Sequence, residues 1–509
     1  GRPLMQRTIS LGDVARRLER EGLLRGVVNA PEPLDSIALG DVTGDSRQAA
    51  AGALFCAVAG NAGDGHAFLG DVAAKGAAAA TVERPDDSLA LPQLVVSDGR
   101  LASAYAAAEF FGDPWNELTL VGITGTNGKT TTAAILRHVL GRRGPAASIG
   151  TLGAVGRDGQ VIPGTEGLTT PGPVDLARWL RRMVDDGIRF VAMEVSAHAL
   201  HQGRAAAARF DAGLFTNLTR DHLDYHRTME EYREAKLGLV GLLKPDGAAV
   251  LNADDEAWRG VDGRGHRVIR FALSHTAEVR ADDVRVGSGG MEWTLTTPNG
   301  GADVALPLFG SYNVANALGA AATLWSLGWS AGEIATGLAT LPQVPGRLER
   351  VAGPPNAPTT LIDYAHTPDA LERALQAVRP LVKGRVIVVF GAGGDRDPGK
   401  RPEMGAIAAR LADLAIVTSD NPRTEDPDRI ADDVERGMGD APRVRILDRT
   451  EAIRRALHEG RPEDLVLLAG KGHETYQIRG TEKFDFDERV IVNEILSGRE
   501  RVSAMGAGK

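Results

Sequence analysis

The stretch Gly122-Ile123-Thr124-Gly125-Thr126-Asn127-Gly128-Lys129-Thr130-Thr131-Thr132 follows an apolar run at 118–123 and precedes an apolar helical pattern at 133–140. A strand, a glycine loop and a helix in this order are typical of a site for the phosphates of ATP. Glycines let backbone N–H groups approach the phosphate oxygens, and the N-terminus of the helix adds positive potential. Lys129 supplies a mobile cation and Thr130 a hydroxyl for Mg²⁺. The stretch therefore predicts that the chain binds a nucleotide.

The loop departs from the common P-loop, which requires a glycine five residues before Gly128, where this chain has Ile123. An ordinary glycine turn is the competing interpretation, but Lys-Thr-Thr directly after Gly128 argues against it. We expect the ATP phosphates to contact the loop and the three residues that follow its second glycine. These residues are Gly125, Thr126, Asn127, Gly128, Lys129, Thr130 and Thr131.

Length and composition narrow the class of protein. A chain of 509 residues predicts three domains at about 150 residues each. The net charge of −9 gives no basic footprint for nucleic acid, so we expect no nucleic-acid partner. The single cysteine, Cys56, lies in an apolar run and fits a reducing compartment. No apolar run reaches the length of a membrane span and the start has no signal-peptide core, so we expect a cytoplasmic protein. We also expect a monomer, although no sequence pattern indicates the oligomeric state.

Helix and strand patterns alternate along the whole chain, which predicts an α/β fold. We place an α/β domain at 1–116, a central ATP-binding domain with a mostly parallel sheet at 117–344, and a third domain at 345–509. In the third domain, apolar strands end in polar or glycine-rich loops with helices between them. This doubly wound, Rossmann-like pattern places ligands at the carboxyl ends of the strands.

Several polar residues follow the glycine loop at positions that suggest chemistry. Glu194 ends an apolar strand, where a carboxylate is a candidate ligand of Mg²⁺ or simply an exposed strand end. His222 and His226 have i,i+4 spacing, but no third ligand follows in a pattern that would indicate zinc. Lys236 lies in an expected helix that starts near Met229, and a lone helical lysine is usually solvated.

The motifs together resemble the Mur ligase family. The loop at 125–131 is similar to that of Mur ligases and folylpolyglutamate synthetases, and 217–226 is similar to the Mur signature Asn-Leu-x-x-Asp-His-Leu-Asp-x-His. The resemblance covers essentially the whole chain. It implies a ligase that uses ATP and two Mg²⁺ ions, with Lys236 carbamylated by CO₂. The implied catalytic residues are Lys129, Lys236, His222 and Glu194, and the implied metal ligands are Thr130, Glu194, His222 and Lys236.

The same resemblance implies the remaining contacts. The ATP site would also include Asn313, Asn316, Arg347 and Asp363. A UDP-muramoyl dipeptide would contact Ser46, Thr169, Thr170, Ser196, Gln202 and Arg204, although Leu168 stands where some members have Asn. The added amino acid would contact Arg396, Asp420, Asn421, Pro422, Arg423, Gly470 and Glu474.

The implied reaction adds meso-diaminopimelate to UDP-N-acetylmuramoyl-L-alanyl-D-glutamate through an acyl phosphate. Diaminopimelate differs from lysine by a second carboxylate, which the planar guanidinium of Arg423 can bind through two N–H bonds. Asp420 and Glu474 can balance its far ammonium, and Arg396 can take the other carboxylate. A lysine-adding ligase, a folylpolyglutamate synthetase-like ligase and a nucleotide-binding regulator without catalysis are the alternatives.

Overall fold

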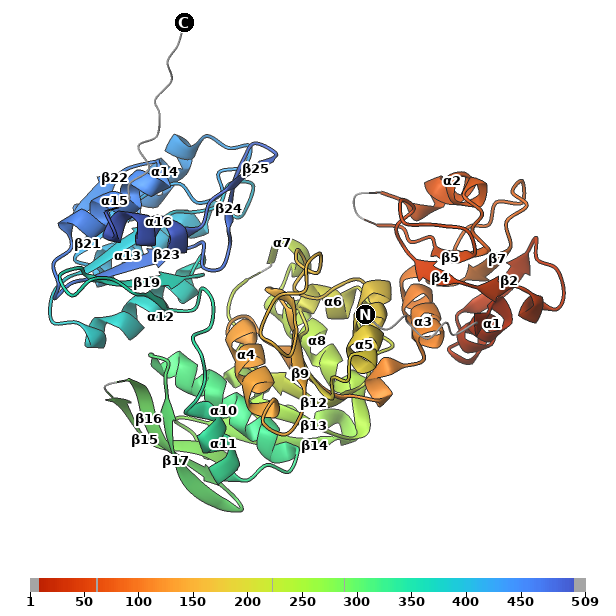
Figure 1. Cartoon of the computed structure of the whole chain (residues 1–509), viewed down its shortest axis with the longest axis horizontal. Coiled ribbons are helices and arrows are strands. Elements are labelled where there is room, and N and C mark those ends of the chain that lie inside the picture. Colours follow the sequence, from red (N-terminus) through yellow and green to blue (C-terminus); the bar gives the residue numbers. More distant parts are fainter. Residues whose placement is uncertain (1–8, 61–62, 222, 288, 499–509) are drawn as a thin grey trace, which may run out of the picture. The chain divides into compact units, whose positions relative to one another are not determined.

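The computed structural model describes residues 9–60, 63–221, 223–287 and 289–498. The described chain divides into two compact units. The first unit comprises the residues up to Arg280 together with 297–300 and 318–334, and the second comprises 281–296, 301–317 and the residues from 335 onward. Figure 1 colours the chain from red at the N-terminus to blue at the C-terminus.

The first unit begins with a five-stranded sheet whose strand order is β2-β7-β6-β5-β4. Its strands are parallel except for the β2–β7 pair. Every residue of β5 and β6 is buried, as expected for inner strands of a sheet covered on both faces, and Cys56 is one of them. The strands are β2 (Leu24–Val28), β4 (Asp41–Thr43), β5 (Ala53–Cys56), β6 (Ala79–Val82) and β7 (Gln93–Val96).

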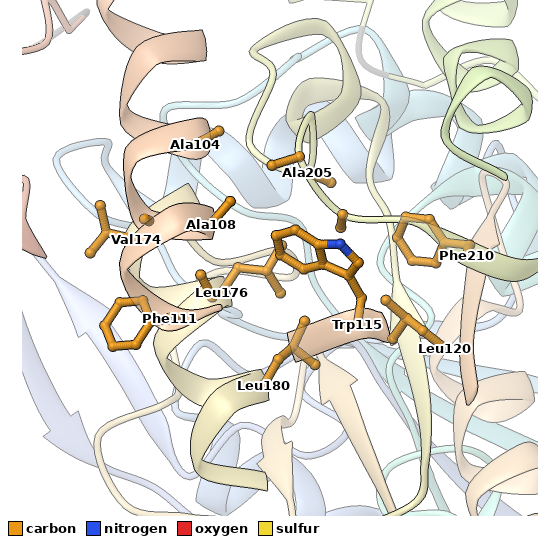
Figure 2. Close-up of a cluster of buried hydrophobic side chains, with 14 of the residues drawn as sticks. Ala104, Ala108, Phe111, Trp115, Leu120, Val174, Leu176, Leu180, Ala205 and Phe210 are labelled. Carbon is orange, nitrogen blue, oxygen red and sulfur yellow. The ribbon is translucent and has the colours of Figure 1, made fainter. Parts of the chain in front are cut away.

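Helix α3 (Gly99–Phe111) joins this sheet to the next part of the unit. Asp98 caps its N-terminus by accepting from two backbone N–H groups, and Gly112 ends it with a φ of 70°. Its alanine side chains allow close packing against α5 (Pro173–Asp185), and Trp115 belongs to the same buried cluster (Figure 2). The residues shown in this cluster include Ala104, Ala108, Phe111, Trp115, Leu120, Val174, Leu176, Leu180, Ala205 and Phe210.

The central sheet has the strand order β10-β9-β11-β8-β12-β13-β14-β15 and is parallel from β9 to β15. Strands β16 (Gly290–Thr297) and β17 (Gly300–Leu306) continue the same sheet beyond β15. Strand β8 lies between β11 and β12, with Glu194 opposite Ile123 and Phe215 opposite Thr124. The carboxyl ends of these three strands therefore meet at one edge. The strands are β8 (Thr119–Thr124), β9 (Ala146–Gly150), β10 (Gly153–Val155), β11 (Phe190–Glu194), β12 (Phe210–Phe215), β13 (Leu243–Asn252), β14 (Arg267–Ala272) and β15 (Val279–Gly287).

The second unit is built on a six-stranded sheet of order β18-β19-β23-β20-β21-β22, parallel except for β18. Buried apolar side chains pack on both of its faces. A separate hairpin, β24 (Tyr476–Arg479) with β25 (Glu482–Asp485), follows β23. The sheet strands are β18 (Glu349–Val351), β19 (Thr359–Asp363), β20 (Val386–Phe390), β21 (Leu414–Val417), β22 (Arg443–Arg445) and β23 (Leu465–Ala469).

The remaining elements complete the layers. They are β1 (Ile9–Ser10), α1 (Leu11–Arg20), β3 (Ala38–Leu39), α2 (Leu69–Ala74), α4 (Lys129–Leu140), α6 (Ala197–His201), α7 (Leu223–His226), α8 (Met229–Leu237), α9 (Glu256–Arg259), α10 (Ser311–Ser326), α11 (Ala331–Leu338), α12 (Pro368–Val378), α13 (Lys400–Leu411), α14 (Pro427–Glu435), α15 (Arg449–Glu459) and α16 (Glu488–Leu496). No helix in the described parts of the chain is long and apolar enough to cross a membrane.

The structure confirms the predicted α/β class with mostly parallel sheets. The predicted start of the helix after the glycine loop is wrong, because α4 begins at Lys129 and not at Ala133. Three consecutive threonines, which are β-branched and poor helix formers, obscured its first turn in the sequence. Gly128, at a φ of 87°, turns the loop directly into the helix.

Candidate active site

The glycine loop of the first unit is fixed by the segment that follows β12. Thr126 N donates to Asn217 O at 2.8 Å, and Asn127 N donates to Asn217 Oδ1 at 2.9 Å. Thr216 Oγ1 donates to Asn127 O at 2.7 Å. Gly125 has a φ of 148°, and a Cβ at this position would lie 1.8 Å from Thr216 Oγ1, so no other residue fits here. These hydrogen bonds tie the loop, which we call the cradle, to the segment after β12.

Two lysines meet on one carbonyl of this cradle. Lys129 Nζ donates to Gly125 O and to Thr126 O, both at 2.8 Å. Lys236 Nζ, from α8, donates to the same Gly125 O at 2.8 Å. Lys129 is predicted from the sequence among the ATP-binding residues and Lys236 among the metal ligands, and the structure brings both ammonium groups to one backbone oxygen.

Lys236 is a buried side chain and not a solvated one. Its exposed fraction is 1%, and its Nζ lies 4.3 Å from the centre of the Tyr232 ring. Burial holds the pKa of Lys236 well below its ordinary value, and the neighbouring Lys129 lowers it further, while Asp221 opposes the shift. The neutral amine is thereby favoured at this position.

Glu194 lies at the same sheet edge, on the neighbouring strand. It is 1% exposed, and its two carboxylate oxygens accept from Thr151 N at 3.0 Å and from Thr151 Oγ1 at 3.1 Å. Thr130, in the first turn of α4, is also buried. A carboxylate and a threonine hydroxyl are oxygen donors that suit Mg²⁺. Among the residues that the structure describes, no three His, Cys, Asp or Glu side chains gather as a metal cluster. His222 lies outside the described residues.

Five of the six predicted muramoyl-peptide residues form one hydrogen-bonded chain that reaches Glu194. Thr151 Oγ1 lies 3.1 Å from Thr169 Oγ1, and Thr170 Oγ1 donates to the backbone oxygen of Glu194 at 3.0 Å. Ser196 N donates to Thr170 Oγ1 at 3.0 Å. The chain continues with Arg204, which donates to Thr170 O at 3.1 Å and to Gln202 Oε1 at 2.7 Å.

Ser46 lies apart from this chain, on the loop after β4, where Lys75 Nζ donates to its backbone oxygen at 2.6 Å. Helix α5 connects the two regions, because it starts just after Thr170 and its Arg178 forms an ion pair with Asp41 of β4 at 2.9 Å. Burial raises the pKa of Asp175 at the start of α5, and Asp45 beside Ser46 adds to that shift. The Ser46 loop therefore lies near the N-terminus of α5.

In the second unit, the predicted ATP residues fall into two groups. Asn313 and Asn316 are buried in the first turns of α10, where Asn313 Nδ2 donates to Phe309 O at 2.8 Å. Asp363 ends β19 and accepts from Leu348 N at 2.7 Å and from Ala365 N at 2.9 Å. Burial raises the pKa of Asp363 to about 6, against the opposing effect of the Arg347 guanidinium and these two bonds.

The predicted amino-acid site is assembled from the loops after β20, β21 and β23. A Cβ on Gly393 would lie 3.1 Å from Arg423 Nη1 and 3.8 Å from Arg396 Cγ, so the two arginines flank the same glycine. Arg423 Nη1 donates to Gly394 O at 2.7 Å, and Pro422 is buried beside it.

The acidic side of this site is bridged by a residue that the sequence did not indicate. Lys471 Nζ contacts Asn421 Oδ1 at 2.6 Å, Glu474 Oε2 at 3.1 Å and Asp420 Oδ1 at 3.1 Å. Gly470 has a φ of 119°, and a Cβ there would lie 3.2 Å from Asp420 Oδ2. The seven residues predicted for the amino acid thus occur together in the second unit.

Comparison with known proteins identifies the family of this chain. The Mur ligase middle domain matches residues 123–324, and the Mur ligase glutamate ligase domain matches 346–472. UDP-N-acetylmuramoyl-L-alanyl-D-glutamate--2,6-diaminopimelate ligase of Geobacillus kaustophilus is 46% identical over 465 residues, covering 89% of this chain and 94% of that protein. This chain belongs to the Mur ligase family.

Two further relatives extend that result. The ligase of the same name from Geobacter metallireducens is 44% identical over 514 residues, covering 95% of this Mur ligase and 99% of the relative. A solved structure of a UDP-N-acetylmuramoyl-L-alanyl-D-glutamate--2,6-diaminopimelate ligase is 29% identical, with a TM-score of 0.67 over 97% of this chain and 99% of that one. The match therefore covers both units of the fold.

Sequence reasoning missed the buried charges behind the amino-acid site of this Mur ligase. Arg449 and Glu488 are fully buried and form an ion pair at 2.8 Å, and Arg449 also donates to Ala469 O at 2.8 Å. Gln477 of the hairpin donates to Asp420 O at 2.8 Å. The sequence shows one sign of this buried ion pair, which is a charged residue within an otherwise apolar pattern. It does not show which residues pair, because Arg449 and Glu488 lie far apart in the chain.

Proposed function

We propose that this chain is the ATP-dependent ligase that adds meso-diaminopimelate to UDP-N-acetylmuramoyl-L-alanyl-D-glutamate. Relatives named for that reaction are 44% and 46% identical over nearly the whole chain, which favours it over the lysine-adding and folylpolyglutamate synthetase-like alternatives. The observation that carries the choice of amino acid is the joint placement of Arg396 and Arg423 beside one glycine, next to the carboxylates of Asp420 and Glu474.

The proposed reaction has two steps. The D-glutamate carboxylate attacks the γ-phosphorus of ATP, which forms an acyl phosphate and releases ADP. The free amine of diaminopimelate then attacks the acyl carbon, the amide bond forms, and inorganic phosphate leaves with the loss of a proton from the amine. Lys129 binds the phosphates and offsets the negative charge that develops on the transferring group, while the glycine loop provides backbone N–H groups.

We propose that Thr130 and Glu194 hold one Mg²⁺, and that His222 and Lys236 hold a second. The metal ions would supply charge neutralisation at the transferring phosphoryl group. Lys236 is suited to carbamylation, because CO₂ adds only to a neutral amine and the burial of Lys236 favours that form. Addition of CO₂ with loss of a proton converts the amine into a carbamate, whose two oxygens can bind a metal ion.

The remaining assignments complete the proposal. ATP would also contact Asn313, Asn316, Arg347 and Asp363, and the muramoyl peptide would contact the chain from Thr169 to Arg204 and the Ser46 loop. We propose domain limits of 1–116, 117–344 and 345–509, and a monomer that acts in the cytoplasm.

Phosphate release from ATP tests this function. It would be measured with UDP-N-acetylmuramoyl-L-alanyl-D-glutamate and either meso-diaminopimelate or L-lysine. Turnover with diaminopimelate alone is expected. Turnover with lysine alone would support a ligase but overturn the assignment of Arg423. No phosphate release with either amino acid would favour a folate-type ligase or a protein without catalysis.

A further inference from the structure

Lys471 is a fully buried cation next to the proposed amino-acid site. Its side chain is 0% exposed, whereas the side chain of Glu474 is 14% exposed and that of Asp420 is 8% exposed. An ammonium group in this setting is stable only when it is paired and hydrogen-bonded. Lys471 satisfies this condition through three oxygens, one each from Asp420, Asn421 and Glu474.

These contacts fix the orientation of the side chains around Lys471. Asn421 Oδ1 accepts from Lys471 Nζ at 2.6 Å and from Ile478 N at 2.9 Å, so the Nδ2 group must point the other way. It does so and donates to Glu474 Oε2 at 3.0 Å. Glu474 Oε2 therefore receives two donors and is held in place. Lys471 thus orders both residues that flank it.

The charges in this cluster do not cancel. Around Lys471, two carboxylates, those of Asp420 and Glu474, face one ammonium group, so these three groups carry one net negative charge when they are ionised. The buried pair of Arg449 and Glu488 lies beside them, and burial raises the pKa of Glu488. Although burial alone would raise the pKa of Asp420, Lys471 and then Arg449 hold it below its ordinary value. His366, Tyr364, Tyr476, Arg423 and Arg347 are further titratable or charged groups near these carboxylates.

From this geometry we infer that Lys471 is a positioning residue of the amino-acid site, which holds Asn421 and Glu474 in place and leaves one negative charge for a single ammonium group of the incoming amino acid. The inference rests on the proposed function and goes beyond it. It states that the net charge of the site is set by Lys471, a residue that need not contact the ligand. Without Lys471, two neighbouring carboxylates would repel each other, and one of them would take up a proton.

The test compares wild type with Lys471→Met and with Lys471→Gln, which keeps a hydrogen-bond donor but no charge. We expect the KM for meso-diaminopimelate to rise about tenfold or more in both variants, with the KM for ATP nearly unchanged. The increase should shrink as the pH rises from 6.5 to 8.5, because a protonated carboxyl must lose its proton before it can pair with an ammonium group. At each pH, the variant KM is divided by the wild-type KM. This ratio removes the pH dependence that comes from groups present in both proteins.

Lys483→Met is the matched control, since Lys483 lies exposed on β25 of the adjacent hairpin. It should leave every KM unchanged. An unchanged KM for diaminopimelate in folded Lys471→Met would overturn the inference. The proposed function would still stand in that case, provided that the wild type turns over diaminopimelate. A raised KM with no dependence on pH in either variant would also overturn it, because loss of packing alone would produce that result. Absence of turnover in wild type with diaminopimelate would instead contradict the proposed function.

Discussion

Lys129 and Lys236 donate to the same backbone oxygen, that of Gly125, each at 2.8 Å. Two ammonium groups on one carbonyl repel each other, and Lys236 is the one whose pKa burial depresses. The lowered pKa of Lys236 favours the neutral amine that the proposed carbamylation requires, whereas the proposed function uses Lys129 as the cation at the phosphates.

Lys236→Met should lower turnover by about a hundredfold or more without loss of stability. A lysine whose pKa is depressed in the folded protein destabilises it below the pKa of the unfolded chain, so methionine removes a cost at pH 7.5. The measurements are phosphate release and the midpoint of thermal unfolding. Removal of CO₂ from the buffer should reduce wild-type activity, and added bicarbonate should restore it. Full activity of Lys236→Met would refute the carbamate.

Glu194→Gln should raise the Mg²⁺ concentration needed for half-maximal activity by about tenfold or more. The amide keeps one acceptor for Thr151 but places an NH₂ group against the second donor, and it removes the negative charge that a metal ion needs. A Mg²⁺ titration of phosphate release measures this. The control is Glu166→Gln, an exposed glutamate on the loop before Thr169. An identical Mg²⁺ requirement in both variants would remove Glu194 from the metal site.

Arg423→Ala should raise the KM for meso-diaminopimelate by about tenfold or more and narrow the preference over L-lysine. The guanidinium can bind the second carboxylate, which lysine lacks. Competition between the two amino acids in one reaction measures the preference. Arg429→Ala, at an exposed position of α14, should change neither value. If the Arg423 variant kept the wild-type ratio, another residue would have to select the carboxylate.

Much of this arrangement could be predicted from the sequence, and the limits have physical causes. The strand ends at Thr124, Glu194 and Asp363 were visible because apolar runs stop at polar residues. From the sequence, Lys471 was identified only as part of a glycine-rich loop. Its partners Asp420 and Asn421 follow another strand, and a local sequence pattern does not predict contacts between distant loops. The hairpin that binds Asp420 was not expected either, because its strands are short and polar.

Asp363 predicts a pH dependence of stability. Burial raises its pKa to about 6, so the folded protein binds this proton more tightly than the unfolded chain does. The resulting stabilisation is complete below the unfolded pKa and is lost as the pH rises through 6. Between pH 5 and pH 7.5 the loss should be about 1 kcal/mol.

Asp363→Asn should not show that loss, so its thermal midpoint relative to wild type should rise between the two pH values. Differential scanning calorimetry measures both proteins. Asp440→Asn, at an exposed position after α14, should follow wild type. Parallel curves for wild type and the Asp363 variant would show that Asp363 titrates normally.

If Arg423 selects the amino acid as proposed, the backbone at this position restricts how that preference can change over evolution. Arg423 has a φ of 51°, a left-handed conformation that side chains branched at Cβ avoid. Its N–H donates to Ile478 O at 3.2 Å and its carbonyl accepts from Gly480 N at 2.7 Å, so the hairpin holds that conformation. Val, Ile or Thr at this position would therefore strain the loop, and the mutational routes to a new substrate favour Gly, Asn and Asp. A larger change in specificity has to remodel the hairpin together with the residue that it supports.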